Sequence, residues 1–358
     1  MTLSVCFIVR NEIDVIGRSL ACARKFADEI IVVDTGSTDG TQEEVKKYTD
    51  KLYFTEWTDD FSAARNFAFE KATSDYVMWL DADDVVTDIN CRKIRELVDG
   101  GGFDMAYLVY CSGFEGERPT FSYMRERIFL RSENYRFSGF VHEAVSPRGK
   151  TVRSDAEIHH RKVKAGDPFR NLNIYQRAIA RGICLDDRAK FYYGRELMFN
   201  GLYREAAAVL EDFLSGGGWV ENKIEASLNL CSVYEALGDK KRAMAALLKS
   251  FTFDSPRAEA CCRLGGYFFE KKEYRPAIYW YTRATECRDG LESGAFVNAN
   301  YSTYIPCIQL CVLYDRLGDY KTACAFNEEA GRFKPQDEIY LQNKRYFQNK
   351  LSKEVKDE

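Results

Sequence analysis

Carboxylate side chains follow an apolar run that has the composition of a buried strand. The segment Tyr76–Asp83 reads YVMWLDAD, so Asp81 and Asp83 come after its last large apolar residue. Carboxylate oxygens are ligands that Mg²⁺ and Mn²⁺ prefer, and such a cation neutralises a diphosphate. The spacing therefore indicates metal-assisted chemistry on a diphosphate, with a plain turn as the alternative.

Two other segments bring polar groups to the same region. VVDTGSTDGT places Asp34 at the end of a second apolar run, and DDFSAARN places Arg65 and Asn66 ahead of the acidic run. Ligands of open α/β sheets bind at the carboxyl ends of the strands, so these groups are expected near one another. Structural alternatives stay open, because Arg65 could pair with surface acids and Asn66 could cap a turn.

The three histidines of the chain are His142, His159 and His160, all within one short segment. Imidazole is a suitable ligand for Mn²⁺. Adjacent residues on a strand face opposite ways, so only one ring of the pair His159 and His160 is expected to reach the same ion.

The elements that position these groups alternate between β-branched runs and helical patterns up to about residue 165. Strands are expected at Leu3–Val9, Glu29–Asp34, Lys51–Trp57 and Tyr76–Asp83, and helices at Glu12–Phe26, Gln42–Tyr48 and Phe61–Ala72. This alternation is typical of a parallel or mixed sheet covered by helices.

From Asp167 onward, helical periodicity and a repeat replace that pattern. Small residues recur at Ala206, Ala243, Ala277 and Ala323, with spacings of 37, 34 and 46, and each follows by twelve positions another small residue, namely Gly194, Cys231, Gly265 and Cys311. Such a pattern is typical of tetratricopeptide helix pairs. The longest spacing indicates an insertion over residues 288–303. An irregular helical bundle is the alternative.

Composition excludes several classes of protein. Fifty-five acidic and fifty-one basic residues in 358 give a net charge of -4, which favours neither nucleic acid nor an anionic membrane as a partner. No apolar run has the length of a membrane span, and the first residues lack a basic leader, so a cytoplasmic location is predicted. The twelve cysteines form no CxxC spacing, which favours reduced thiols. The absence of GxGxxG argues against a dinucleotide-dependent oxidoreductase.

Together, FIVRNE, VVDTGSTDGT, ARN and DADD resemble the family 2 glycosyltransferases. The later segments FSGFVHEA, EIHH, RNLNIY and FYYGREL resemble the branch in which tetratricopeptide-like helices follow, a branch that includes the peptide S-glycosyltransferases of glycosylated bacteriocins. The resemblance implies an α/β GT-A nucleotide-sugar-binding domain over residues 1–165. It also implies a linker helix over 166–188, an all-α tetratricopeptide-like repeat domain over 189–346 and a polar tail over 347–358.

The resemblance also implies roles for individual residues. The resemblance assigns nucleotide-sugar binding to Val9, Glu12, Asp34, Arg65, Asn66, Asp81 and Ala82. Asp83 and His160 would hold Mn²⁺ or Mg²⁺, with His159 as the alternative ring. Transfer to an acceptor needs a group that takes its proton, and Glu143 in the VHE segment is the candidate base, with a structural role as the alternative.

The leading hypothesis is a metal-dependent inverting glycosyltransferase that moves a hexose from a UDP-sugar to an acceptor such as a peptide or protein side chain. The missing Gln-x-x-Arg-Trp motif argues against a polysaccharide synthase. Two alternatives stay open: a helical-repeat scaffold with an inert GT-A domain, and a glycosyltransferase that acts on a cell-surface glycan. A homodimer also stays open.

Overall fold

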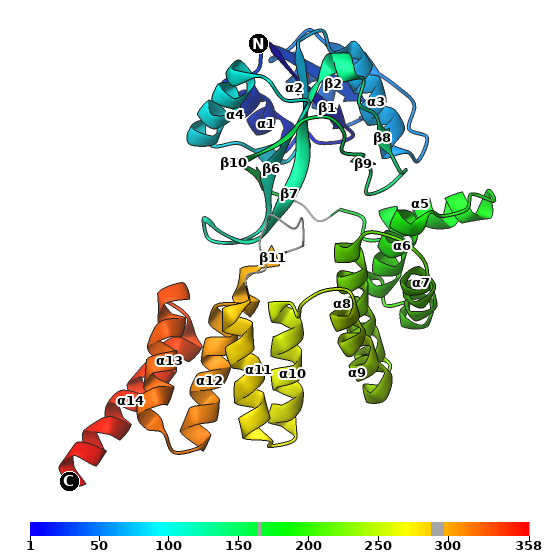
Figure 1. Cartoon of the computed structure of the whole chain (residues 1–358). Helices are drawn as coiled ribbons and strands as arrows, with labels where there is room; N and C mark the ends of the chain where they lie inside the picture. The colour runs from blue at the N-terminus through cyan, green and yellow to red at the C-terminus, as the bar shows by residue number, and fades with distance from the viewer. Residues whose placement is uncertain (164–165, 288–296, 358) are drawn as a thin grey trace. The chain divides into compact units, whose positions relative to one another are not determined.

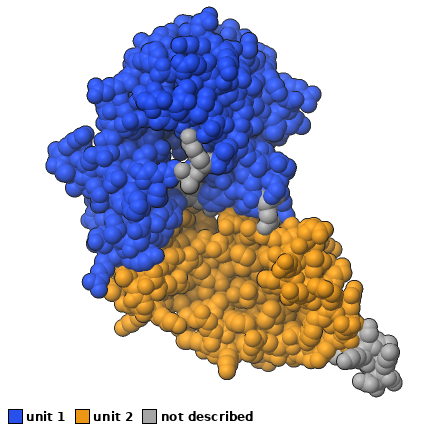
Figure 2. Space-filling view, turned by 180° about the vertical axis from the view of Figure 1, so that it is seen from behind, with its two compact units in different colours: residues 1–219 blue, residues 220–358 orange. Residues whose placement is uncertain are grey.

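The computed structural model describes residues 1–163, 166–287 and 297–357. The chain divides into unit 1, Met1–Trp219, and unit 2, Val220–Glu358 (Figure 2). Unit 1 holds a sheet, the helices that cover it and three further helices, whereas the described elements of unit 2 are helices and the short strand β11 (Val297–Asn298) (Figure 1). The expected domain limits at residues 165, 188 and 346 stay predictions.

Eight strands of unit 1 form a mixed sheet in the order β3-β2-β1-β4-β7-β6-β10-β5. Their bounds are β1 (Leu3–Val9), β2 (Glu29–Asp34), β3 (Leu52–Phe54), β4 (Tyr76–Leu80), β5 (Asp84–Val85), β6 (Met105–Glu115), β7 (Arg118–Leu130) and β10 (Thr151–His160). β1 pairs in parallel with β2 and with β4, so the carboxyl ends of these three strands lie at one edge. β8 (Phe137–Ser138) and β9 (Ala144–Val145) form a separate antiparallel pair.

Successive residues of β1 enter different cores on the two faces of the sheet. Val5 and Phe7 pack in a cluster with residues of α1 (Ile16–Ala23), α2 (Thr41–Val45) and α4 (Asp88–Gly100). Cys6, between them, belongs to a cluster with residues of α3 (Phe61–Lys71) and β8. Burial on both faces explains why this strand reads as a continuous apolar run.

The expected sheet covered by helices is confirmed, with shorter elements. The helix expected over Glu12–Phe26 is α1, which begins at Ile16 because the preceding residues form a turn. In that turn the carbonyl of Glu12 accepts hydrogen bonds from the amides of Val15 at 3.1 Å and Ile16 at 2.9 Å. The long hairpin of β6 and β7, which turns at Gly116 with φ +60°, is an addition to the elements expected from the sequence.

The helices that follow the sheet form pairs of neighbours in sequence. Their bounds are α5 (Arg170–Ala180), α6 (Asp187–Phe199), α7 (Tyr203–Ser215), α8 (Val220–Ala236), α9 (Lys240–Lys249), α10 (Ala258–Glu270), α11 (Tyr274–Glu286), α12 (Tyr304–Arg316), α13 (Tyr320–Phe333) and α14 (Glu338–Asp357). Helix α6 packs on α7, α8 on α9, α10 on α11 and α12 on α13 (Figure 1). The expected tetratricopeptide-like pairing is therefore confirmed.

Small residues allow the paired helices to approach closely. A methyl group added at Gly194 of α6 would lie 2.6 Å from Leu210 of α7, and one added at Gly265 of α10 would lie 2.8 Å from Tyr281 of α11. These distances are below van der Waals contact, so a larger residue would separate the helices. The repeat therefore follows from the spacing of small residues.

The turns inside two pairs share one construction. Gly238 and Gly318 adopt φ values of +77° and +82°, and the next residue, Asp239 or Asp319, caps the following helix with its carboxylate. Glycine tolerates this left-handed conformation, and aspartate is a preferred N-cap. Residues 288–296 of the predicted insertion lie outside the described residues.

None of the helices within the described ranges is both long and apolar enough to cross a bilayer. All twelve cysteines fall in these ranges and are free thiols.

Candidate active site

A buried arginine joins two carboxylates beyond the end of β4. Arg65 of α3 donates from Nη2 to Asp81 Oδ1 at 2.7 Å and from Nε to Glu143 Oε1 at 2.5 Å. Its side chain is 6% exposed, and its guanidinium carbon lies 4.1 Å from the centre of the Trp79 ring. The structure therefore brings three of the predicted site residues together in one ion-paired group.

The charges of this group keep Asp81 ionised. Burial favours the neutral carboxyl, but the guanidinium groups of Arg65 and Arg127 outweigh burial and hold the pKa of Asp81 well below its usual range. Asp81 is thus an acceptor of hydrogen bonds at neutral pH. One oxygen of this carboxylate already forms an ion pair with Arg65.

A second group of predicted ligands lies where β5 meets β10. The two strands are antiparallel, and their register places His160 opposite Asp84. His160 Nδ1 lies 3.1 Å from Asp83 Oδ1 and 3.4 Å from Asp84 Oδ1. One ligand atom of each of the three residues lies within 4.8 Å of the others.

This donor set fits a divalent cation. Two carboxylates and an imidazole are ligands that Mn²⁺ and Mg²⁺ accept. Among the residues the structure describes, the buried atoms Asp84 Oδ1 and His160 Nδ1 have no hydrogen-bond partner of good geometry. Burial alone would lower the pKa of His160, but Asp83 and Asp84 outweigh it and raise the pKa to about 10. A cation at this site would therefore displace a proton from the ring.

Asp84 and Arg127 are central to this region although no role was predicted for either from the sequence. Arg127 of β7 is fully buried and donates from Nη1 to Asp84 Oδ2 at 3.1 Å. Its guanidinium carbon lies 3.6 Å from the centre of the Trp79 ring. Arginines at alternate positions of an apolar strand, here Arg125 and Arg127, are the sequence signal that could have indicated this site.

Asp34 ends β2 and organises the turn that follows it. Its Oδ1 accepts hydrogen bonds from the amides of Gly36 and Ser37, both at 2.8 Å. Its other oxygen, Oδ2, is buried and has no hydrogen-bond partner in the described parts of the chain. A buried acceptor of this kind is costly unless a ligand donor reaches it.

The remaining predicted residues occupy the same edge in different ways. Val9 ends β1 opposite Asp34, and Ala82, between Asp81 and Asp83 in the sequence, is buried. Glu12 lies in the turn before α1, where its amide donates to Thr41 Oγ1 at 2.8 Å. Asn66 instead exchanges two hydrogen bonds with the backbone of Phe137, at 2.8 Å and 3.0 Å. Asn66 therefore has a structural contact with β8 in place of the turn cap considered as its alternative, and its nucleotide role stays a prediction.

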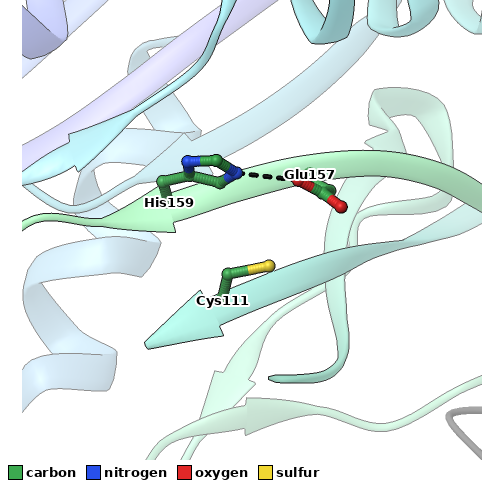
Figure 3. A group of neighbouring side chains, drawn as sticks. All are labelled: Cys111, Glu157 and His159. Atoms are coloured by element: carbon green, nitrogen blue, oxygen red, sulfur yellow. Dashed lines mark hydrogen bonds and ion pairs between the residues drawn. The ribbon is translucent and has the colours of Figure 1, made fainter. Parts of the chain in front are cut away.

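The alternative ring, His159, lies on the other face of β10. Its Nε2 is 2.8 Å from Glu157 Oε2, and Cys111 of β6 lies beside it (Figure 3). Adjacent strand positions therefore separate the two histidines, and His160 is the ring that approaches Asp83.

Comparison with known proteins agrees with this fold. Residues 4–157 match the family model for Glycosyl transferase family 2. This part of the chain is therefore similar to a family 2 glycosyltransferase domain, and a series of tetratricopeptide-like helix pairs follows it.

Several curated proteins are similar to parts of the chain. A TPR repeat-containing protein of Synechococcus elongatus is 36% identical over 143 residues, which is 40% of this chain and 35% of that protein. The glycosyltransferase SunS of Bacillus subtilis is 31% identical over 40% of this chain and 34% of its own length. The lipopolysaccharide core biosynthesis glycosyltransferase LpsC of Rhizobium meliloti is 27% identical over 57% of this chain and 83% of its own length.

The chain spans about a third of the length of the first two of these relatives. Among solved structures, a tetratricopeptide repeat protein from Parabacteroides merdae overlaps 53% of this chain and 69% of its own, with 16% identity and a TM-score of 0.40.

Proposed function

We propose that the chain is a metal-dependent inverting glycosyltransferase that transfers a hexose from a UDP-sugar to an acceptor. The observation that carries the proposal is the group Asp83, Asp84 and His160, whose ligand atoms lie within 4.8 Å of one another. The family match over residues 4–157 supports the same reaction class.

Groups at the sheet edge would contact the base and the diphosphate of such a donor. Asp34 Oδ2 is a buried, unpartnered acceptor that would take the N–H of a uracil base. Asp83, Asp84 and His160 would hold Mn²⁺ or Mg²⁺, and that cation, when bound, would neutralise charge on the diphosphate. Val9 and Asp34 end neighbouring parallel strands, so the base would sit beside the strand that leads to the acidic group.

Glu143 is the proposed base of the transfer step. Its carboxylate is 7% exposed, and Arg65 binds one of its oxygens while also binding Asp81. Arg65 would therefore fix the direction from which Glu143 takes the acceptor's proton. As the acceptor atom bonds to the anomeric carbon, the bond from that carbon to the diphosphate oxygen breaks, which inverts the configuration.

Two acceptor classes remain proposals. The resemblance to peptide S-glycosyltransferases favours a peptide or protein side chain. The similarity to LpsC, named for lipopolysaccharide core biosynthesis, favours a cell-surface glycan. Incubation of the enzyme and a UDP-sugar with a peptide library and, separately, with truncated lipopolysaccharide would distinguish them by mass spectrometry. The predicted cytoplasmic location and homodimer stay predictions.

The site assignment is tested by calorimetry with UDP. Wild-type protein is expected to bind UDP only with Mn²⁺ or Mg²⁺, and Asp83→Ala is expected to lose that binding. The matched control is Asp155→Ala on β10, because Asp155 is 82% exposed and forms a surface ion pair with Lys93. Unchanged metal-dependent UDP affinity in Asp83→Ala would overturn the assignment. Normal UDP binding without transfer to any acceptor from any UDP-sugar would favour the inert scaffold.

A further inference from the structure

A second group of potential metal ligands lies on the face of β10 opposite to His160. It consists of Cys111 on β6 and of Glu157 and His159 on β10 (Figure 3). β6 and β10 are parallel, with His159 directly beside Cys111 in the register. Glu157 precedes His159 by two positions and therefore shares its face. The backbone pairing alone brings all three side chains together.

The distances within this group are short. One ligand atom of each residue lies within 4.8 Å of the others, and His159 Nε2 lies 2.8 Å from Glu157 Oε2. Cys111 is 1% exposed and His159 is 8% exposed, whereas the side chain of Glu157 is 38% exposed. The thiol and the ring are thus buried, and an ion from solvent would reach the group on the side of the partly exposed Glu157 carboxylate.

The surroundings disfavour a reactive thiol and place a carboxylate beside Cys111. Burial, followed by the charge of Glu157, raises the pKa of Cys111 to about 12, so the free thiol is protonated and a poor nucleophile. The Phe114 ring packs against the His159 ring, with ring centres 5.1 Å apart. The nearby cation Arg161 stacks over Phe114 at 3.6 Å and pairs with Glu117 at 2.7 Å, which offsets its charge.

We propose that Cys111, Glu157 and His159 form a second cation site, selective for Zn²⁺ and similar ions. A thiolate, an imidazole and a carboxylate are the ligand types that Zn²⁺ combines, with a water molecule in the fourth position. The group at Asp83 and His160 contains no sulfur and suits harder ions. The thiol proton is released to solvent when the ion binds. The proposal does not depend on glycosyl transfer.

Cobalt spectroscopy tests the site in the full chain. Co²⁺ replaces Zn²⁺ in such sites, and its bond to a thiolate produces a charge-transfer absorption that oxygen and nitrogen ligands do not give. The parent protein carries Cys184→Ser, because Cys184 is the exposed thiol of the chain. We expect the absorption to saturate at about one equivalent of Co²⁺ in the presence of excess Mg²⁺, and to vanish on addition of Zn²⁺.

Cys111→Ser is expected to abolish the absorption, and His159→Gln to weaken Co²⁺ binding by about 10-fold or more. Cys91→Ser is the matched control, because Cys91 is another buried thiol and lies outside the group. An absorption that is absent in the parent, or that persists in Cys111→Ser, would overturn the proposal. If circular dichroism shows that Cys111→Ser does not fold, Glu157→Gln decides instead, since its side chain is partly exposed. Unchanged Zn²⁺ affinity in Glu157→Gln, measured against a chromophoric chelator, would then overturn it.

Discussion

His142 Nε2 lies 2.8 Å from Glu196 Oε1. This contact connects the loop that carries the candidate base, Glu143, to helix α6. The His142 ring also stacks on Tyr192 of the same helix, with ring centres 4.1 Å apart. Arg188 donates two hydrogen bonds to the carbonyl of His142, at 3.0 Å and 3.2 Å. His142 adopts φ +52°, a conformation that a residue other than glycine holds only when its surroundings fix it. Helix α6 therefore determines the path of the loop that carries Glu143.

The first prediction tests this role of α6. Glu196→Gln removes the charge that holds His142, so Glu143 is expected to be less well placed. We expect the transfer rate to fall by about 10-fold or more, with donor affinity nearly unchanged. Rapid-quench kinetics and UDP calorimetry measure the two quantities. Glu205→Gln, on the exposed surface of α7, is the control. A loss of donor affinity equal to the loss of rate would show that α6 stabilises the whole domain.

The second prediction concerns acidic pH. Burial lowers the pKa of His142, and the hydrogen bond to Glu196 only partly offsets this; Arg195 and Glu143 contribute smaller, opposite effects. As the pH is lowered below about 6.5, His142 therefore takes up a proton more readily in the unfolded chain than in the folded chain. The free energy of unfolding consequently decreases as the pH decreases. His160 has the opposite sign: its stabilisation is complete below about pH 6.5 and is lost as the pH rises towards about 10.

Urea unfolding near pH 7 and near pH 5 measures this effect. His142→Asn removes the titrating ring and keeps a side chain that tolerates positive φ. The variant is expected to lose less stability than wild type over this interval, with a difference of at most about 1.4 kcal/mol per pH unit for one proton. Equal losses in the two proteins would show that His142 does not titrate differently on folding.

The third prediction concerns the buried pair of Asp84 and Arg127. Asp84→Ala leaves a fully buried guanidinium without its carboxylate, which is expected to lower the free energy of unfolding by about 3 to 5 kcal/mol. Asp88→Ala is the control, because Asp88 is 78% exposed in its pair with Lys25 and its loss should cost less than about 1 kcal/mol. Denaturant unfolding compares the two. Similar losses in the free energy of unfolding for the two variants would mean that water or a rearranged side chain replaces the contact of Asp84 with Arg127.

The fourth prediction tests Glu143 as the base. Glu143→Gln keeps the shape of the side chain, and its amide oxygen can still accept from Arg65, so donor binding should survive. Loss of the basic group is expected to slow transfer by about 10² to 10⁴. Single-turnover transfer and UDP calorimetry separate the two effects. If Asp81 and Arg65 were disordered by the change, UDP affinity would fall with the rate, and Glu143 would then be a structural partner of Arg65.

The sequence predicts the sheet edge well because the relevant residues follow strands directly. Asp34 and Asp83 each come at the end of an apolar run, and the parallel pairing of β1 with β2 and β4 places the ends of these runs at the same edge. It does not predict pairs such as Asp84 with Arg127, or His142 with Glu196, because these partners lie 43 and 54 positions apart and no local pattern links them. Asn66 is the opposite case. The motif predicted a contact with the nucleotide, whereas its side chain forms a hydrogen bond with the backbone of Phe137.

The last prediction separates the chemistry from acceptor recognition. Unit 1 ends at Trp219 and so includes α6, whereas a chain ending at Arg188 would lack Tyr192 and Glu196. A truncated protein of residues 1–219 is expected to fold and to retain metal-dependent hydrolysis of the UDP-sugar by water. The repeats of unit 2 form helix pairs of a kind that binds elongated partners, so transfer to the true acceptor should fall steeply.

The shorter protein, residues 1–188, is expected to lose donor hydrolysis as well, because it lacks the contacts of Tyr192 and Glu196 with the His142 ring. Circular dichroism checks that each truncated protein is folded, and chromatography of released UDP and of glycosylated acceptor measures the two activities. Transfer by residues 1–219 at the full-length rate would remove unit 2 from acceptor recognition. Full donor hydrolysis by a folded chain of residues 1–188 would show instead that the loop carrying Glu143 keeps its conformation without α6.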